Sequence, residues 1–216
     1  MRIKDVVIER AKTSRLVSSI LDGVVTRKEM RIWRSQAFAA PSPSHVKREC
    51  LRRNGLSNGT WVETGTYLGI TTEFLGQNFP RVISIEPDPE LFRRASARLS
   101  KYANIEVLNT TSEIGFSEAL GRLQGDVNFW LDGHFSGGST FEGNQVTPIL
   151  NELGEIVTHL PQFDAVVVMI DDVRLFTDEG GPDSDGYPDK SVLIEWAETN
   201  RLSWSFEHDI FVARSR

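Results

Sequence analysis

Short apolar runs alternate with stretches of helical periodicity from residue 60 to the end of the chain. The runs have the length and the β-branched or aromatic content of buried strands, and glycine or polar residues follow them. Strands are predicted at 61–62, 82–85, 105–108, 127–131, 164–170, 202–207 and 210–213. The first five alternate with helices, which is typical of a parallel sheet, and the last two form a hairpin. The sequence therefore predicts an α/β protein with a Rossmann-like, doubly wound, seven-stranded, mostly parallel sheet and an antiparallel last strand.

The first 54 residues precede this alternation and are predicted to be helical. Apolar residues recur there at helical spacing up to Val24, with charged residues between them. A Pro-Ser-Pro-Ser stretch ends at Ser44, which is the predicted cap of a second helix running toward Asn54. We expect an N-terminal helical extension over 1–54 and one domain over 55–216. The helices could cover a ligand site, line a substrate pocket or pair with another subunit of a homo-oligomer. Packing on the edge of the domain is the favoured interpretation.

Composition limits the classes of protein to consider. A chain of 216 residues with 39% hydrophobic content can bury one substantial core. The net charge of −6 argues against a nucleic-acid-binding face, which would need a basic stripe. The single cysteine, Cys50, excludes an intramolecular disulfide and suits a reducing compartment. No run approaches the roughly 18 apolar residues of a membrane span. We therefore expect a soluble, cytoplasmic protein without nucleic-acid partners.

The stretch 60–87 carries the first chemical signal. A predicted strand leads into Glu63 and a turn with Gly65 and Gly69, and after a helix the next strand stops at Glu86, 23 residues beyond Glu63. In a β-α-β unit, an acidic residue at that distance reaches the hydroxyl groups of a ribose. An ordinary turn with a fortuitous acidic residue is the alternative.

The turn also indicates which nucleotide is bound. It lacks the second glycine that lets the backbone approach a pyrophosphate, and Glu63 would repel a diphosphate. A dinucleotide-dependent dehydrogenase is therefore disfavoured. A ligand with a ribose, no phosphate and a cationic amino-acid end would suit this turn and Glu63. S-adenosylmethionine fits this description.

The residues Glu63-Thr64-Gly65-Thr66-Tyr67-Leu68-Gly69, followed by Glu86, resemble the first two motifs of the class I S-adenosylmethionine-dependent methyltransferases. The resemblance covers about residues 55–213. It implies a cofactor site with Glu63, Gly65, Thr66 and Gly69 at the methionine end, Glu86 at the ribose, and Ser112 and Glu113 near the adenine. Ser112 and Glu113 also suit a helix N-cap and a first-turn acidic residue.

Three more acidic residues follow two of the predicted strands. Asp132 comes after strand 127–131, and Asp171 and Asp172 come after strand 164–170. The carboxyl ends of neighbouring parallel strands meet in one crevice, so these side chains should converge. Converging carboxylates repel one another unless a cation such as Mg²⁺ neutralises them.

This arrangement is similar to the metal-dependent small-molecule O-methyltransferases of the catechol and macrolide-sugar kinds. The resemblance implies that Asp132, Asp171 and Asp172 hold the metal. In the alternative interpretation, Asp132 touches the methionine end of the cofactor and Asp171 caps the following turn. The sequences of the segments Leu131–His134 and Ile170–Phe176 also resemble those of uncharacterised bacterial methyltransferases.

The predicted function is methyl transfer from S-adenosylmethionine to a hydroxyl group of a small molecule, with a sugar or glycan precursor as one candidate acceptor. Asp132 and His134 are the predicted catalytic residues. Catechol-type enzymes carry a lysine base three residues beyond the first acidic residue, where this chain has Phe135. A metal-independent methyltransferase acting on another nucleophile and a non-catalytic cofactor-binding protein are the alternatives.

The role of His134 yields a test. If His134 is the general base that deprotonates the acceptor, His134→Ala should lower the rate about 10²–10⁴-fold and leave cofactor affinity nearly unchanged. If it only orients a metal ligand, the same change should weaken metal affinity by about 10–100-fold, and excess Mg²⁺ should restore the rate. A magnesium titration of the variant separates these roles, and full recovery at saturating Mg²⁺ would rule out the base.

Overall fold

The sheet of the protein contains seven strands in the order β3-β2-β1-β4-β5-β7-β6. The structure is a computed structural model that describes residues 15–132, 148–177 and 187–215, with side chains from residue 25 onward. The strands are β1 (Thr60–Thr64), β2 (Arg81–Ile85), β3 (Ile105–Leu108), β4 (Gly125–Leu131), β5 (Phe163–Ile170), β6 (Ser203–Glu207) and β7 (Ile210–Arg214). Strands β1 to β5 pair in parallel, and β7 is antiparallel to both β5 and β6. The predicted fold class is confirmed.

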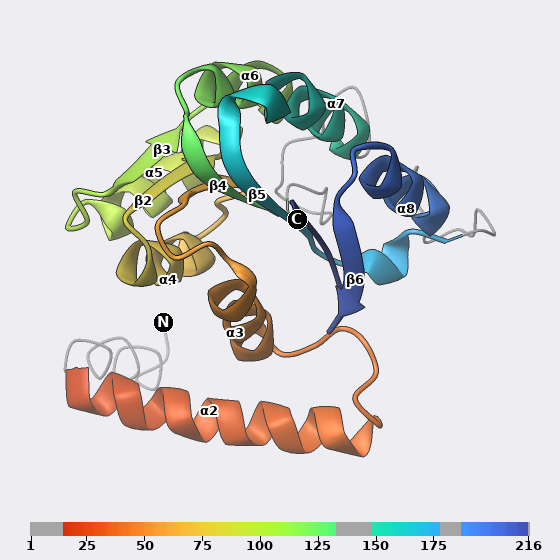
Figure 1. Cartoon of the computed structure of the whole chain (residues 1–216). Helices are drawn as coiled ribbons and strands as arrows, with labels where there is room; N and C mark the ends of the chain where they lie inside the picture. Colours follow the sequence, from red (N-terminus) through yellow and green to blue (C-terminus); the bar gives the residue numbers. More distant parts are fainter. Residues whose placement is uncertain (1–14, 133–147, 178–186, 216) are drawn as a thin grey trace.

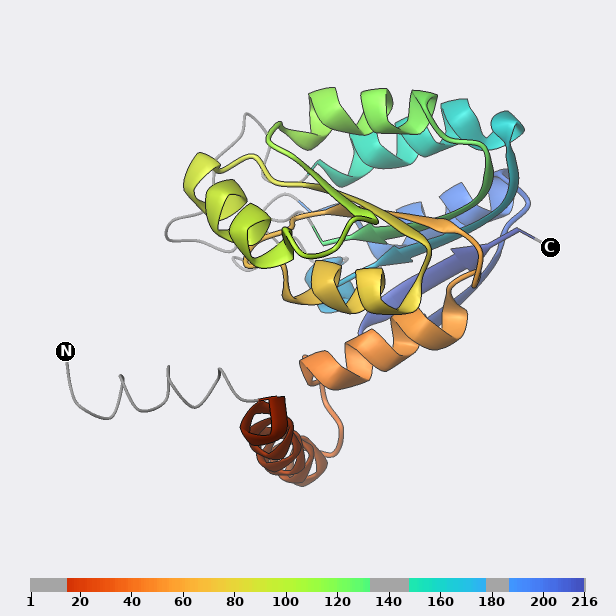
Figure 2. The same cartoon turned by 90° about the vertical axis from the view of Figure 1, so that its left-hand side faces the viewer.

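Helices cover both faces of the sheet (Figures 1 and 2). The α-helices of the described residues are α2 (Arg15–Ser35), α3 (Ser44–Asn54), α4 (Ile70–Asn78), α5 (Pro89–Leu99), α6 (Ser112–Gly121), α7 (Ile149–His159) and α8 (Lys190–Thr199), and the short 3₁₀ helices are η1 (Leu160–Gln162) and η2 (Val173–Leu175). Helices α6, α7 and α8 contribute to one apolar core, while α3 and α4 contribute to the core on the opposite face.

Alternating side chains of the central strands enter the two cores. Trp61 of β1 and Trp130 of β4 belong to the core beneath α3 and α4, whereas their neighbours Val62 and Phe129 belong to the core beneath α6 and α7. Successive residues of a strand point to opposite faces, and both faces are covered here. This explains why the strands read as continuous apolar runs in the sequence.

The order of the strands positions the functional edge. The chain proceeds outward from β1 through β2 to β3, then returns to the other side of β1 with β4 and β5. In open α/β sheets ligands bind beyond the carboxyl ends of the strands at this point of reversal. The carboxyl ends of β1 and β4 therefore lie side by side at the expected ligand edge.

The N-terminal helices join the domain in two places. Helix α3 contributes the buried residues Cys50 and Leu51 to the core. At the end of α2, the buried Trp33 donates a hydrogen bond from its indole nitrogen to the Ala39 carbonyl oxygen at 2.8 Å, and its ring lies 5.6 Å from that of His208. The predicted cap at Ser44 is wrong by one position, because Pro43 is the N-cap residue and Ser44 opens the helix.

No helix in the described part of the chain is long and apolar enough to cross a membrane.

Candidate functional site

The turn after β1 requires glycine at two positions. Gly65 and Gly69 have φ angles of 85° and 72°, which lie in the left-handed region. A side chain at Gly69 would also meet Leu99 at 3.1 Å. The backbone nitrogens of Gly65 and Thr66 donate to the Ile85 carbonyl oxygen at 3.0 and 3.2 Å, which ties the turn to the end of β2. The two predicted glycines thus shape the wall of the candidate cofactor site.

Glu63 lies inside this wall. Its side chain is 1% exposed and accepts hydrogen bonds from the hydroxyl groups of Thr72 and Ser84, both at 2.6 Å. The Ser84 hydroxyl lies 2.6 Å from that of Thr66 as well. Burial raises the pKa of Glu63 to about 7, although the hydrogen bonds from Ser84 and Thr72 oppose the shift. Glu63 therefore joins β1, β2 and α4, and its predicted contact with the methionine end of a cofactor stays a prediction.

Glu86 connects the end of β2 to the same turn. One carboxylate oxygen accepts from the backbone nitrogen of Tyr67 at 2.7 Å, and the other accepts from that of Asp88 at 3.0 Å. Burial raises its pKa, against these two hydrogen bonds. A carboxylate has about four acceptor sites, so both oxygens keep capacity for the hydroxyl groups of a ribose. This placement suits the predicted role.

The predicted adenine contacts lie at the start of α6. Thr111 is the N-cap residue and Ser112 is the first residue of the helix, so the alternative prediction that Ser112 is the cap is wrong. Glu113 is an acidic residue of the first turn, as predicted. Both residues line a pocket of about 330 Å³ that α6 shares with α7.

The three predicted aspartates converge. Oxygen atoms of Asp132, Asp171 and Asp172 all lie within 4.8 Å of one another. Backbone hydrogen bonds continue the parallel pairing at the strand ends, from Asp132 to Thr64 at 3.2 Å and from Asp171 to Leu131 at 3.1 Å. The pairing of β1, β4 and β5 thus brings the carboxylates together.

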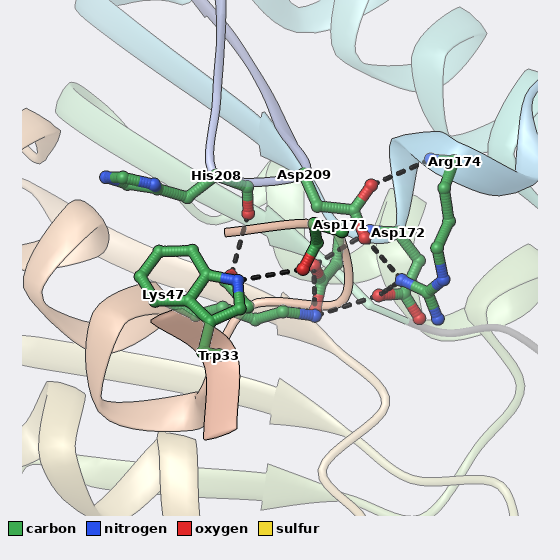
Figure 3. A network of polar contacts seen from close by, with 9 residues as sticks. Trp33, Lys47, Asp171, Asp172, Arg174, His208 and Asp209 are labelled. Atoms are coloured by element: carbon green, nitrogen blue, oxygen red, sulfur yellow. Dashed lines mark hydrogen bonds and ion pairs between the residues drawn. The ribbon is translucent and has the colours of Figure 1, made fainter. Parts of the chain in front are cut away.

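Two basic side chains already pair with this cluster, which the sequence analysis did not foresee (Figure 3). The ammonium group of Lys47 lies 2.6 Å from Asp171 and 2.8 Å from Asp172, and its side chain is 16% exposed. Arg174 contacts Asp172 at 2.5 Å and also pairs with Asp209. The metal prediction assumed that the repulsion between the carboxylates was uncompensated. That premise is wrong, because Lys47 and Arg174 offset part of the charge.

The surroundings shift the pKa values of the three acids in different directions. Burial and the nearby charge of Asp171 raise the pKa of Asp132 well above its usual range. Burial raises the pKa of Asp171 to about 6, although the charge of Lys47 opposes the shift. Burial opposes ionisation of Asp172 too, but Arg174 and Lys47 outweigh it and lower that pKa to about 2. Asp172 is therefore an anion near neutral pH, while Asp132 favours either a proton or a further cation.

A pocket of about 390 Å³ adjoins the cluster. Residues from the N-terminal segment line one side of it, including Ser42, Lys47 and Arg48, and Trp130 and the three aspartates also contribute. The Ser42 hydroxyl donates to the His208 carbonyl oxygen at 2.9 Å, so the turn between β6 and β7 holds this segment in place. Helix α3 thus does more than pack on the edge of the domain, since it lines the pocket and supplies a charged group.

The predicted base His134 lies outside the described residues, and its role stays a prediction.

Solved structures resemble this fold at low sequence identity. No protein-family model matches the sequence, and no curated protein does. A candidate rRNA methylase from Clostridium thermocellum has a TM-score of 0.52 at 12% identity, over 78% of this chain and 94% of that one. A candidate methyltransferase from Streptococcus mutans, solved with S-adenosylhomocysteine, has a TM-score of 0.50 at 11% identity, over 82% of this chain and 98% of that one. These likenesses show that the chain has the Rossmann-like fold found in methyltransferases.

Burial of Glu63 predicts a pH-dependent stability. Its pKa is raised in the folded state, so the unfolded chain loses the proton first and stability falls as pH rises from about 4.5 to about 7. Glu63→Gln should remove this contribution, so that the variant gains about 2–4 kcal/mol relative to wild type between pH 5 and 8. Urea unfolding at both pH values measures the difference. The exposed Glu118→Gln is the control, and a Glu63→Gln curve parallel to the wild-type curve would contradict the prediction.

Proposed function

We propose that this protein transfers the methyl group of S-adenosylmethionine to a hydroxyl group of a small molecule. The observation that carries the proposal is the hydrogen bond from the backbone nitrogen of Asp132 to the carbonyl oxygen of Thr64. Thr64 immediately precedes the glycine turn, whereas Asp132 belongs to the carboxylate cluster. The wall suited to the cofactor and the polar cluster suited to an acceptor are therefore adjacent.

The cofactor would lie along the turn after β1. Gly65 and Gly69 let the backbone approach its methionine end, and Glu63 and Thr66 hold the turn from inside through Ser84. Glu86 would accept hydrogen bonds from the ribose, and Ser112 and Glu113 would flank the adenine. Bound S-adenosylmethionine supplies an electrophilic methyl group, so the protein has mainly to orient and deprotonate the acceptor.

The acceptor would enter the pocket of about 390 Å³ beside the aspartates. This volume lies within the range of small-molecule sites, which are about 300–1,000 Å³. The similar structure from Clostridium thermocellum is named as a candidate rRNA methylase, which makes RNA the competing acceptor. The net charge of −6 favours a small molecule, because RNA binding needs a basic surface.

A divalent cation fits the aspartate cluster chemically, on one condition. Three carboxylates with oxygens within 4.8 Å are the hard ligands that Mg²⁺ prefers. Lys47, however, pairs with two of them and would have to withdraw. We propose that Asp132, Asp171 and Asp172 hold Mg²⁺, which would lower the pKa of the acceptor hydroxyl, and that His134 removes its proton.

The ion pairs of Lys47 favour one alternative. In a metal-independent methyltransferase acting on another nucleophile, Lys47 and Arg174 would offset part of the cluster's charge throughout the reaction, and Lys47 would orient the acceptor from the pocket wall. A third possibility is a protein that binds the cofactor without turnover, and it would show no methylated product in any acceptor screen.

The cofactor assignment has a direct test. Calorimetry should detect binding of S-adenosylhomocysteine but not of NAD. Glu86→Ala should weaken that binding by about 1.5–3 kcal/mol, the usual contribution of hydrogen bonds to a charged group. Glu90→Ala, which removes a nearby exposed carboxylate paired with Arg93, is the control and should bind like wild type. Tight NAD binding, or an unchanged affinity in Glu86→Ala, would overturn the assignment.

The metal assignment can be tested without knowing the acceptor. Lys47→Met should lower stability by up to about 3–5 kcal/mol in the absence of cations, because it removes one partner of buried ion pairs. Millimolar Mg²⁺ or Mn²⁺ should then raise its melting temperature more than that of wild type, since the competing ammonium group is gone.

The matched control is Lys101→Met, which removes an exposed lysine from its ion pair with Glu73. It should respond to the cations as wild type does, and Asp171→Asn added to Lys47→Met should abolish the response. A melting temperature of Lys47→Met that is insensitive to both cations would leave the metal-independent alternative.

A further inference from the structure

A buried carboxyl group with an unsatisfied oxygen lies beside the pocket between α6 and α7. The two helices run side by side over one face of the sheet (Figure 2), and the pocket of about 330 Å³ lies between their first turns. Glu152 of α7 lines this pocket and is only 3% exposed. One of its carboxyl oxygens has no hydrogen-bond partner in the described part of the chain.

A buried glutamate with an unpaired oxygen lowers the stability of the folded state, so folding alone does not explain its presence. A buried polar group without a partner destabilises the folded state, whereas a leucine at the same position would bury apolar surface without that penalty. Burial raises the pKa of Glu152 to about 8, although the hydroxyl groups of Ser112 and Thr64 oppose the shift. The charge of Glu113 raises it further. The carboxyl group is therefore protonated at neutral pH, and it has the capacity to donate one hydrogen bond and accept another.

The neighbours of Glu152 indicate what the free oxygen could bind. Thr64 is the last residue of β1, immediately before the turn assigned to the methionine end of the cofactor. Ser112 opens α6, the helix assigned to the adenine. Glu152 faces both of these side chains and so lies between the two ends of the proposed cofactor site. We infer that Glu152 binds the adenine ring of S-adenosylmethionine, an inference that rests on the proposed function.

The chemistry of the two groups is complementary. Adenine presents an amino group, which donates, next to a ring nitrogen, which accepts. A protonated carboxyl group matches this edge with two hydrogen bonds, because its carbonyl oxygen accepts from the amino group while its hydroxyl donates to the ring nitrogen. An ionised carboxylate has acceptors only and would face the lone pair of the ring nitrogen. Glu152 would therefore select adenine in its neutral form.

Substitutions that mimic or remove the neutral acid test this inference. A glutamine amide has the same shape and the same donor and acceptor pair, so Glu152→Gln should bind S-adenosylhomocysteine within about threefold of wild type. Glu152→Leu should weaken binding by about 10–100-fold, which corresponds to the loss of one or two hydrogen bonds. Glu118→Leu, which changes an exposed glutamate of α6 outside the pocket lining, is the control and should bind like wild type.

A pH series separates recognition from a structural role. The probe is 5′-methylthioadenosine, which has no group that titrates between pH 7 and 9.5. Wild-type affinity should fall about tenfold across this range as Glu152 ionises, while that of Glu152→Gln should stay flat. The other described titratable groups that line the pocket, Glu113 and Glu155, are present in both proteins.

The outcomes distinguish this inference from the proposed function. S-adenosylhomocysteine binding that is equal in wild type and Glu152→Leu would overturn the adenine contact and leave the cofactor assignment intact. A flat wild-type pH series would overturn it too, even if Glu152→Leu failed to fold. Absence of S-adenosylhomocysteine binding to wild type would overturn both.

Discussion

The ion pairs between Lys47 and the aspartates after β5 hold together the part of the protein where its chemistry would occur. The parallel strands bring Asp132, Asp171 and Asp172 close together. Burial there disfavours the charged form of these carboxyl groups. Lys47 offsets two of those charges from a helix that precedes the sheet in sequence. Helix α3 is thus bound to the functional edge by electrostatics as well as by the apolar packing of Cys50 and Leu51.

The same interaction belongs to a longer chain of contacts (Figure 3). Asp172 binds Arg174, which in turn binds Asp209 in the turn between β6 and β7. The neighbouring residue His208 accepts a hydrogen bond from Ser42, five residues before Lys47. The final hairpin therefore holds Ser42 and Arg174, which line the pocket together with Lys47. A ligand or cation that displaced Lys47 would break its ion pairs with Asp171 and Asp172.

Three buried acids in this region favour the neutral form more than an exposed carboxyl group would. Glu63 joins β1 to β2 and α4, Asp132 belongs to the aspartate cluster, and Glu152 faces Thr64 and Ser112. Each is buried where ionisation is costly, and such groups concentrate at ligand sites more often than elsewhere. All three lie near the ends of β1 and β4, where the methyltransferase site is proposed.

The fold class and the convergence of the aspartates could both be predicted from the sequence. Both follow from local patterns, because apolar periodicity marks the strands and parallel strands bring their carboxyl ends to the same edge. The glycine turn after β1 was equally readable, since positive φ angles select glycine. The helix starts at Ser44 and Ser112 were each missed by one residue, because capping depends on where helical backbone angles begin.

The surroundings of the carboxyl groups could not be predicted from the sequence. Lys47 lies 124 residues before Asp171 in the chain, and no spacing rule connects a lysine on one helix to the end of a strand so far away. Its direction is set by the packing of α3 against the sheet. Glu63 is buried between β1, β2 and α4, and Glu152 is buried where α7 packs against α6. The charge state of an acid depends on its neighbours in space, which the order of residues alone does not specify.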